Sequence, residues 1–178
     1  MKPSASPLDS LDLSDAGPIP DRDGLVLDRF LPYRLSVLAN TVSRAIARLY
    51  ADRFGITIPE WRVLAILGDS GPVTSAEIRD RTAMDKVQVS RAIQRLVSAR
   101  LVSRRTDPAD RRRATIAMTG KGNGVYREIV PLALSREAIL LEGFSAEERE
   151  QLDVLLNRLG DRAGAIAGPS DDTAGGVD

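Results

Sequence analysis

The stretch that decides the fold is Asp85-Lys-Val-Gln-Val-Ser-Arg-Ala-Ile-Gln-Arg-Leu-Val-Ser-Ala99, which is predicted to form one amphipathic helix. Its apolar side chains recur every three or four residues, the spacing that places them on one face of a helix. The side chains expected on this inward face are Val89, Ile93, Leu96 and Val97. Polar side chains near the N-terminus of the helix are left on its outer face.

Two shorter helices are predicted before this stretch. Each begins with a capping box, in which a threonine caps the first turn and a glutamate three residues later bonds back to it. The two boxes are Thr57-Ile-Pro-Glu60 and Thr74-Ser-Ala-Glu77. The first helix is expected to end at Gly68 and the Gly71-Pro72 pair, and the second near Thr82.

A charged β-hairpin is predicted after the helix at 85–99. Its strands are Leu101–Thr106 and Ala114–Thr119, joined by the polar turn Asp107-Pro-Ala-Asp-Arg-Arg-Arg113. Two short helices, a longer helix and a charged hairpin, in this order, are typical of a winged helix-turn-helix. The expected fold class is therefore mainly α with a small β-hairpin, and long flanking helices form a dimerisation layer.

These flanking helices carry apolar stripes that the winged unit does not use. The first helix of the chain runs from about Leu27 to Phe54. After the hairpin, a fifth helix ends near Glu142 and is bent or interrupted near Pro131. The last helix begins at a third capping box, Ser145-Ala-Glu-Glu148. The stripes are Leu31, Leu35, Leu38, Val42, Ile46 and Leu49 in the first helix, and Leu152, Leu155, Leu156 and Leu159 in the last. Because the stripes need a partner and lie at both ends of the chain, we expect a two-fold homodimer.

The sequence therefore predicts five segments. They are a flexible N-terminal tail at 1–24, a dimerisation helix at 25–56, a winged helix-turn-helix DNA-binding domain at 57–119, C-terminal dimerisation helices at 120–167 and a flexible tail at 168–178. The tails are assigned from their Pro, Gly, Ser and Asp content and their lack of any sustained apolar period.

Composition excludes several classes of function. The chain of 178 residues has no cysteine and no histidine, so it lacks the usual metal ligands, the thiol nucleophile and the commonest general base. We expect no metal, no cofactor and no enzyme activity, since no nucleophile–base pair can be assembled. No apolar run approaches the ~18 residues of a membrane helix, and we expect a cytoplasmic protein without a membrane partner.

Charge is concentrated in one segment although the net charge of the chain is zero. Thr74–Arg113 holds eleven Lys and Arg residues against five acidic residues, a net charge of +6, and the remainder holds 14 basic against 20 acidic residues. A basic island of this kind is the electrostatic footprint of a nucleic-acid site. The expected partner is double-stranded DNA.

The helix at 85–99 supplies the candidates for reading bases, because a recognition helix lays its N-terminal side chains in the major groove. They are Lys86, Gln88, Ser90 and Arg91. Gln88 can pair with adenine, and Arg91 or Lys86 with guanine, whereas Ser90 suits a base or a phosphate. The alternative is a merely solvated helix face.

Further candidates lie in the hairpin and at a helix N-terminus. Arg111, Arg112 and Arg113 occupy the turn. Of Arg104 and Arg105 on the strand, one is expected to contact phosphate, and Arg104 is chosen as the candidate. The turn is alternatively a salt-bridged loop in which Asp107 and Asp110 neutralise the arginines, and both descriptions can hold at once. Ser75 is a candidate phosphate contact at a helix N-terminus, beside Thr74 in its capping role.

An ordered set of motifs resembles the MarR family of bacterial transcriptional regulators. The motifs are Ile58-Pro-Glu-Trp-Arg-Val-Leu64, Thr82–Leu96, Leu101-Val, Asp107-Pro-Ala-Asp-Arg-Arg112, Met118-Thr-Gly-Lys-Gly122 and Ile129-Val-Pro131, and the resemblance covers roughly 27–160. It implies a dimer held by the terminal helices on a pseudo-palindrome near a promoter, with Arg112 in the minor groove and Asp110 orienting it. It also implies a repressor released by a small ligand, often aromatic and anionic, bound between the dimer layer and the winged helix.

The chain departs from the family at Arg100, where a glycine usually ends the recognition helix. A left-handed cap costs a non-glycine residue ~1 kcal/mol. Either the turn is built differently here, or the cost is tolerated because Arg100 reaches a phosphate.

Candidate ligand-binding residues combine aromatic rings with arginine or amide groups, which suit an aromatic acid or its thioester. They are Tyr33, Arg34, Asn40, Arg44, Trp61 and Arg62. The alternative is that Trp61 anchors the core and the arginines form salt bridges in the dimer. Two further functions are a winged helix that contacts protein, and an architectural DNA binder without effector control. Three consecutive arginines in the wing argue against the first, and the acidic remainder against the second.

Overall fold

The computed structural model describes residues 24–106 and 114–167. By their internal contacts the residues form two units, Met1–Val42 and Ser43–Asp178, and the boundary falls within the first long helix. That helix, α1, spans Leu31–Phe54. Each unit is described by itself below.

The described residues of the first unit form a 3-10 turn, Leu27–Arg29, followed by the beginning of α1. The prediction that the helix starts near Leu27 is therefore wrong by one turn. Pro32 explains the difference, because its ring clashes with the carbonyl of the residue four positions earlier in a continuous helix. Leu31, Leu35 and Leu38 are all exposed within this unit.

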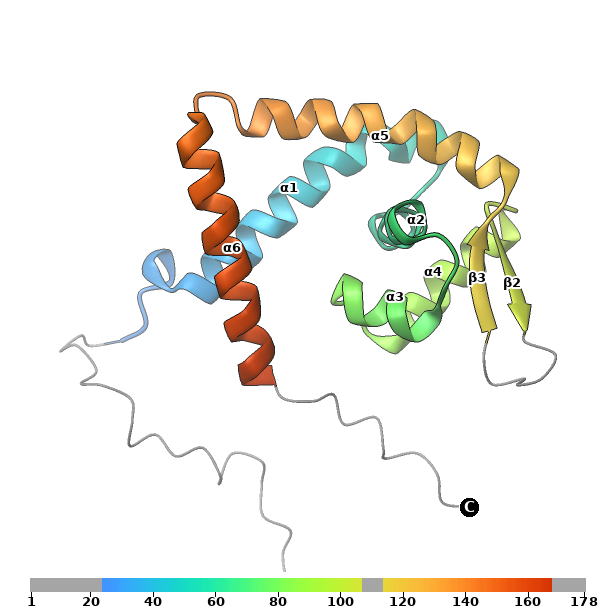
Figure 1. Cartoon of the computed structure of the whole chain (residues 1–178), viewed down its shortest axis with the longest axis horizontal. Coiled ribbons are helices and arrows are strands. Elements are labelled where there is room, and N and C mark those ends of the chain that lie inside the picture. Colours follow the sequence, from blue (N-terminus) through green and yellow to red (C-terminus); the bar gives the residue numbers. More distant parts are fainter. Residues whose placement is uncertain (1–23, 107–113, 168–178) are drawn as a thin grey trace, which may run out of the picture. The chain divides into compact units, whose positions relative to one another are not determined.

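The second unit contains the predicted winged helix-turn-helix (Figure 1). Its helices are α2, Ile58–Ser70, α3, Ser75–Thr82, and α4, Lys86–Ser98. Its hairpin strands are β2, Val102–Thr106, and β3, Ala114–Met118. The fold class expected from the sequence, mainly α with a small hairpin and a winged helix-turn-helix, is confirmed.

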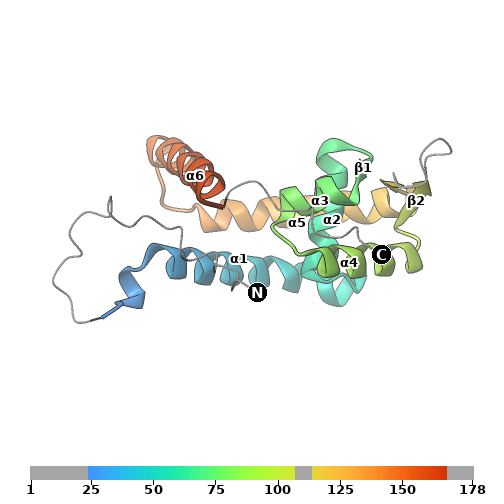
Figure 2. The ribbon, with the colours of Figure 1, turned by 90° about the horizontal axis from the view of Figure 1, so that it is seen from below.

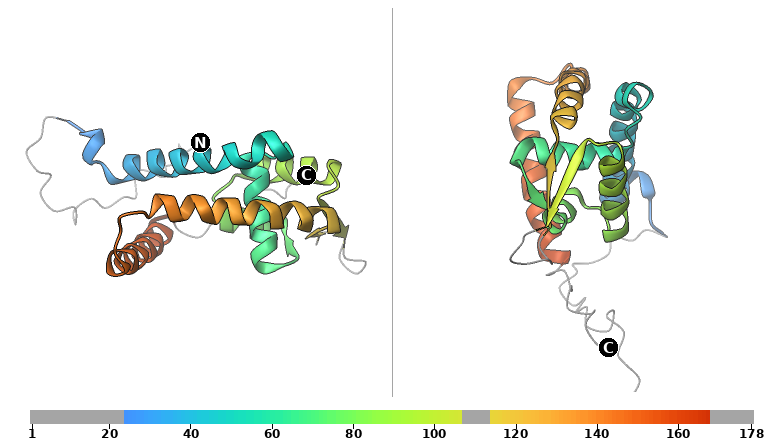
Figure 3. Two further views of the ribbon diagram at one scale, coloured as in Figure 1. Left: turned by 90° about the horizontal axis from the view of Figure 1, so that it is seen from above. Right: turned by 90° about the vertical axis from the view of Figure 1, so that its right-hand side faces the viewer.

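A third strand, β1, was not expected from the sequence. It consists of Val73–Thr74 and pairs antiparallel with β3, so the sheet order is β1-β3-β2. Two residues are too few to show a strand period in a sequence. The hairpin pairs from Val102 opposite Met118 to Thr106 opposite Ala114, and it stands beside α4 (Figure 3).

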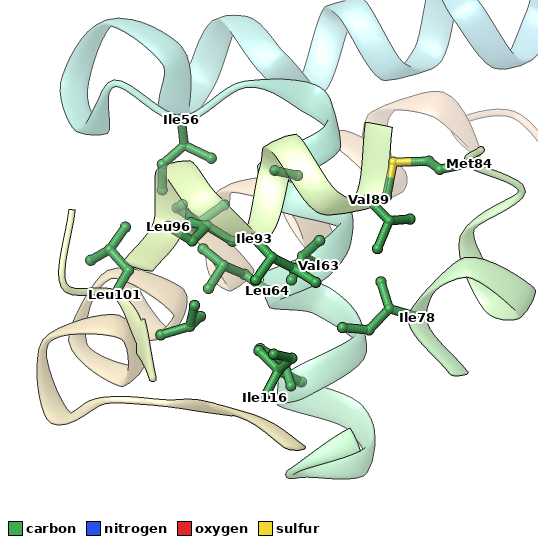
Figure 4. Close-up of a cluster of buried hydrophobic side chains, with 14 of the residues drawn as sticks. Ile56, Val63, Leu64, Ile78, Met84, Val89, Ile93, Leu96, Leu101 and Ile116 are labelled. Carbon is green, nitrogen blue, oxygen red and sulfur yellow. The ribbon is translucent and has the colours of Figure 1, made fainter. Parts of the chain in front are cut away.

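One apolar core joins α2, α3, α4 and the sheet (Figure 4). The buried face of α4 consists of Val89, Ala92, Ile93 and Leu96. Val97, expected on that face, is 40% exposed instead. A helix turns ~100° per residue, so Val97 lies on the flank beside Leu96 and not over the core.

Gly68 lies inside α2, which continues to Ser70 and does not end at Gly68 as predicted. A Cβ at this position would lie 2.1 Å from Cζ of Tyr126. The glycine therefore makes room for an aromatic ring from a helix much later in the chain, and only the Gly71-Pro72 pair terminates α2.

The two C-terminal helices are α5, Gly120–Leu140, and α6, Ala146–Ala167. Of the bend or interruption expected near Pro131, the interruption does not occur, because α5 continues as one helix through this residue, and the bend stays a prediction. The third capping box is confirmed: the Glu148 carboxylate accepts from Ser145 N at 2.8 Å and Glu148 N donates to Ser145 Oγ at 3.2 Å. None of the helices in the described ranges carries an apolar run long enough to span a lipid bilayer.

Two of the ion pairs between described elements of the second unit have both partners exposed. Arg81 of α3 donates to Asp69 at 2.6 Å and also to Ser70, so the end of α2 is tied to α3. The hydrogen bond from Arg81, together with that from Ser70, lowers the pKa of Asp69. Arg53 of α1 pairs with Glu128 of α5. Both pairs are solvent-exposed, so they orient elements more than they stabilise the fold.

The junction between α4, the hairpin and α5 is held by Leu101 and Thr119. The Leu101 carbonyl accepts from Thr119 N at 3.0 Å, and the Thr119 hydroxyl donates to the Arg100 carbonyl at 2.7 Å, with the Leu101 oxygen farther away at 3.2 Å. Thr119 also caps α5 by accepting from Gly122 N at 3.0 Å. A Cβ on Gly122 would lie 2.0 Å from the Leu101 oxygen, so the close approach of the two chain segments requires glycine there.

Replacing Gly122 with alanine tests this junction. Because the Leu101 carbonyl is backbone and is held by the hydrogen bond from Thr119 N, we expect G122A to lower the free energy of unfolding by about 2 kcal/mol or more. The measurement is urea unfolding followed by circular dichroism at fixed protein concentration. The matched control is G124A in the same helix, where no described atom lies within 4 Å of the new Cβ. We expect G124A to raise stability by ~1 kcal/mol through helix propensity. Equal effects of the two variants would contradict the close approach.

Candidate nucleic-acid interface

Four of the predicted DNA contacts line one hollow of about 210 Å³. They are Ser75, Lys86, Ser90 and Arg104. Three separate elements supply them, namely α3, α4 and β2, which are neighbours in the second unit (Figure 2). Val89, Ile93 and Ile116 form its apolar lining. The hollow therefore presents cationic and hydroxyl groups on a floor that belongs to the core.

Capping at two helix N-termini fixes the α3 and α4 side of this hollow. Thr74 caps α3, with Glu77 N donating to Thr74 Oγ1 at 3.3 Å and Thr74 N donating to the Glu77 carboxylate at 2.7 Å. Asp85 caps α4 by accepting from Gln88 N at 2.7 Å. Ser75 and Lys86, the first residues of the two helices, are thereby placed beside the hollow, and both are exposed.

Strand pairing fixes the opposite side of the hollow. Arg104 lies opposite Ile116 in the hairpin, and Arg105 lies opposite Thr115. Successive strand residues point to opposite faces of a sheet, so only one of the two arginines can line the hollow. That residue is Arg104, which agrees with the choice of Arg104 as the candidate contact.

Gln88 and Arg91 are exposed on α4 but do not line the hollow. Gln88 lies roughly 160° around the helix axis from Ser90. The structure therefore brings Lys86 and Ser90 together with Ser75 and Arg104, and leaves Gln88 on the other flank of the helix. Their contacts with bases remain predictions.

Two residues of the hollow were missed in the sequence, Arg79 and Gln94. Each follows a predicted contact by four positions, Arg79 after Ser75 and Gln94 after Ser90, and helix periodicity is the signal that would have found them. Arg79 Nε lies 3.4 Å from an Asp80 carboxylate oxygen, a pair at the surface.

The predicted wing contacts Arg111, Arg112 and Arg113, and the orienting Asp110, lie outside the described residues. The strands that lead to this segment, β2 and β3, are paired up to Thr106 and Ala114.

Arg100 adopts the left-handed conformation with φ of +60°. Arg100 N donates to the Val97 carbonyl and Leu101 N to the Leu96 carbonyl, each at 2.9 Å, which is the Schellman pattern at a helix C-terminus. Of the two alternatives raised by the sequence, a turn built differently is thus wrong. The remaining alternative, tolerance of the strain for a phosphate contact, is a prediction.

Replacing Arg100 with glycine separates strain from DNA contact. Relief of the left-handed conformation favours the folded state by ~1–2 kcal/mol and added freedom in the unfolded chain offsets ~0.5–1 kcal/mol, so we expect R100G to be about 0.5 kcal/mol more stable. If Arg100 contacts phosphate, the same variant binds DNA more weakly, with a shallower salt dependence. Thermal unfolding and DNA titration at several salt concentrations measure the two effects. Unchanged DNA affinity would eliminate the phosphate contact.

Among the proposed ligand residues, Trp61 is part of an aromatic row. Its ring centroid lies 5.6 Å from that of Tyr50 and 6.0 Å from that of Tyr126, the latter stacked at 24°. Burial raises the pKa of Tyr50 to about 12, against a smaller opposing effect of Arg62, so its hydroxyl stays neutral at physiological pH. This packing supports the core-anchor interpretation of Trp61.

The six ligand candidates are divided between the two units. Tyr33, Arg34 and Asn40 lie in the first unit and are exposed, whereas Arg44, Trp61 and Arg62 lie in the second. A separate hollow of about 290 Å³ lies on the other side of the second unit's α4 and was not expected from the sequence. It contains the buried carboxylate of Glu60, which accepts from Thr57 N at 2.7 Å and lies 3.8 Å from Arg95.

Comparison with known proteins agrees with this fold. The family model described as MarR family matches residues 54–113. The uncharacterized HTH-type transcriptional regulator YkoM of Bacillus subtilis is 32% identical over 106 residues, 60% of this chain and 69% of that protein. The HTH-type transcriptional repressor NicR of Pseudomonas putida is 28% identical over 104 residues, 58% of this chain and 66% of that protein.

Solved structures show the same architecture. The MarR/EmrR family transcriptional regulator from Acinetobacter sp. ADP1 superposes with a TM-score of 0.72 at 29% identity, covering 78% of this chain and 98% of that one. BpsR of Bordetella bronchiseptica, whose DNA binding is regulated by 6-hydroxynicotinic acid, has a TM-score of 0.68 at 25% identity, with coverage of 78% and 98%.

The fold and the hollow that carries Lys86 and Arg104 thus define a DNA-binding winged helix-turn-helix protein. The relatives found by sequence are named as transcriptional regulators. The chain belongs to the MarR family of transcriptional regulators.

Proposed function

We propose that this protein is a homodimeric repressor that binds a pseudo-palindromic operator and is released by a small aromatic acid or its thioester. The observation that carries the DNA-binding part is the hollow at the junction of α3, α4 and β2. Independent elements bring Ser75, Lys86, Ser90 and Arg104 to it, within the segment that carries a charge of +6. A role as repressor, and not as activator, is supported by the name of the relative NicR, a transcriptional repressor.

The chemistry of these groups suits duplex DNA. Lys86 is a cation for phosphate or for guanine acceptors, and the Ser75 and Ser90 hydroxyls donate to phosphate oxygens. Arg104 on β2 extends the cationic surface toward the wing, where Arg112 is proposed to enter the minor groove with Asp110 orienting it. Focused negative potential in narrow A·T tracts favours arginine there.

The competing functions have less support. The relatives carry names of regulators, and the described residues contain no group of three or more acidic side chains placed to hold a metal ion. A non-enzymatic role without cofactor follows from the proposal and from the absence of histidine and cysteine in the sequence. A repressor acts where the chromosome lies, which places the protein in the cytoplasm.

Selection from a random duplex library tests sequence-specific binding. We expect an inverted repeat with half-site centres about 10 bp apart, the spacing of two heads related by a two-fold axis. Fluorescence anisotropy on the selected duplex then compares K86A, R104A and R112A with the native protein. We expect each variant to bind more weakly, and the logarithmic salt slope to fall by about one for each phosphate that the variant no longer neutralises.

The matched control for the removal of charge is R127A, an exposed arginine on α5. It should bind the selected duplex like the native protein. Failure of the selection to return a preferred sequence would reject an operator-binding function. If R127A lowered the affinity as much as R104A, the contribution of Arg104 would be general charge attraction and not a specific contact.

The homodimer is supported by apolar side chains that the chain itself leaves exposed. In α6 they include Leu152, Leu155, Leu156 and Leu159, between 37% and 52% exposed. These four side chains recur at helical spacing along one face of α6, which is the pattern of a helix that packs against another surface. Further exposed apolar side chains follow in α5, at Leu134, Ile139 and Leu140.

A glutamate placed in this stripe is expected to separate the subunits. L156E should shift the protein from twice the chain mass toward the chain mass in sedimentation equilibrium, because a buried unpaired carboxylate is costly. N157E adds the same charge one residue along, at an exposed position that hydrogen-bonds only within its own helix among the described contacts. We expect N157E to remain dimeric. A native protein at the mass of one chain would refute the dimer.

Effector release is proposed from the MarR fold and from BpsR, whose DNA binding responds to 6-hydroxynicotinic acid. Arg62 beside the Tyr50–Trp61–Tyr126 row offers a cation next to aromatic surface in the second unit. An aromatic carboxylate needs these two groups, a guanidinium for its charge and a ring for stacking.

The single tryptophan makes this part of the proposal measurable. We expect an aromatic acid to lower the anisotropy of the DNA complex and to change the fluorescence of Trp61 over the same concentration range. The panel begins with 6-hydroxynicotinic acid and includes benzoate-type acids and their coenzyme A thioesters. R62A should weaken the response while leaving DNA affinity unchanged. If none of the panel releases DNA at millimolar concentration, the proposed effector class is wrong.

A further inference from the structure

Exposed large apolar side chains in the described residues fall into three groups. One lies between Leu25 and Leu38, and one between Leu134 and Ile166, the regions of the proposed dimer stripes. The third contains only Val87, 55% exposed, and Val97, 40% exposed, both on α4. The winged unit therefore exposes large apolar groups, among its described residues, only on its recognition helix.

Val87 lies at the N-terminal end of that helix, one residue after its first, Lys86. It contributes nothing to the core, which α4 contacts through Val89, Ala92, Ile93 and Leu96. A β-branched residue is also a poor choice for an exposed helix position, because its χ1 freedom is lost against the preceding turn. Neither burial nor helix formation accounts for valine at this position.

The neighbours of Val87 on the outer face of α4 are polar. Arg91 follows one turn later, and Lys86 and Gln88 flank it in sequence, all of them exposed. An isolated valine among side chains suited to base edges differs from a protein-docking patch, which is a continuous apolar area. In the major groove the apolar group of a base edge is the C5-methyl of thymine.

We infer that Val87 packs on the 5-methyl group of a thymine in each half-site and so determines sequence preference at that base pair. This inference rests on the proposed operator binding. Side chains in the first turn of a recognition helix are those that reach base edges, and apolar contact with the thymine methyl requires no hydrogen bond from the protein. Val97, near the other end of α4, is not assigned this role.

Deoxyuridine provides the test, because it lacks only the 5-methyl group and keeps the base pairing of thymine. Each thymine of the selected duplex is replaced in turn, symmetrically in both half-sites, and affinity is measured by fluorescence anisotropy for the native protein, V87A and V97A. At one position we expect deoxyuridine to lower the affinity of the native protein. The loss of one buried methyl group lowers affinity about fourfold, so the loss of one in each half-site lowers it about fifteenfold. V87A should bind the thymine and deoxyuridine duplexes equally at that position, and V97A should respond like the native protein.

Thermal unfolding of V87A and V97A confirms that both variants are folded before they are compared. The inference is overturned if no thymine shows a decrease in affinity that disappears in V87A, or if V97A removes the same dependence. Either result would leave specific binding, and with it the proposed function, intact. If the selection returns no preferred duplex, the proposed function fails first and the role of Val87 fails with it.

Discussion

The rest of the DNA-binding surface depends on the hydrogen bonds that tie Thr119 to the end of α4, from Thr119 N to the Leu101 carbonyl at 3.0 Å and from its hydroxyl to the Arg100 carbonyl at 2.7 Å. They join the residue that leads from α4 into the hairpin to the residue that precedes α5. The hairpin leaves from one of these points and returns at the other, so its orientation relative to the recognition helix is set where it begins and ends. The absence of a side chain at Gly122 lets the segments approach, and Lys121 Nζ donates to the Ala99 carbonyl at 3.0 Å beside them.

The basic side chains near this junction are exposed, and one carboxylate, that of Glu60, is buried. Arg104, Lys86 and Ser90 face one hollow while Arg95 lies on the other flank of α4, 3.8 Å from the buried Glu60. A pair whose arginine is exposed in this way adds little stability. Its effect is to neutralise a flank of the helix away from the hollow, so positive charge is concentrated on one side. Steering of an anionic duplex depends on such asymmetry more than on net charge, which is zero for this chain.

The winged fold could be predicted from the sequence because its signals are local. Capping boxes at Thr74 and Ser145 and the period of Val89, Ile93 and Leu96 depend on neighbours a few residues away, and the structure contains each of them. The features that were missed depend on distant segments. Strand β1 exists only through its pairing with β3, and the need for a glycine at position 68 inside α2 comes from the ring of Tyr126, more than fifty residues later.

The candidate site shows the same limit. Residue type alone pointed to Ser75, Lys86, Ser90 and Arg104, and the structure gathers these four into one hollow. Arg79 and Gln94 were missed because their four-residue spacing from Ser75 and Ser90 was not followed along the helices, and the contact of α3 with α4 brings all four residues to the hollow. Whether Gln88 reaches a base depends on the depth of the helix in the groove, a property of the complex and not of the chain.

The left-handed arginine at the end of α4 has a consequence for the genetics of this protein. Every arginine codon becomes a glycine codon by one base substitution at its first position, so Arg100 lies a single point mutation from the residue that best tolerates a φ of +60°. A population selected for growth at higher temperature would have this replacement readily available. Whether such lineages keep control of their target genes would show, without any purified protein, what the arginine contributes beyond the turn.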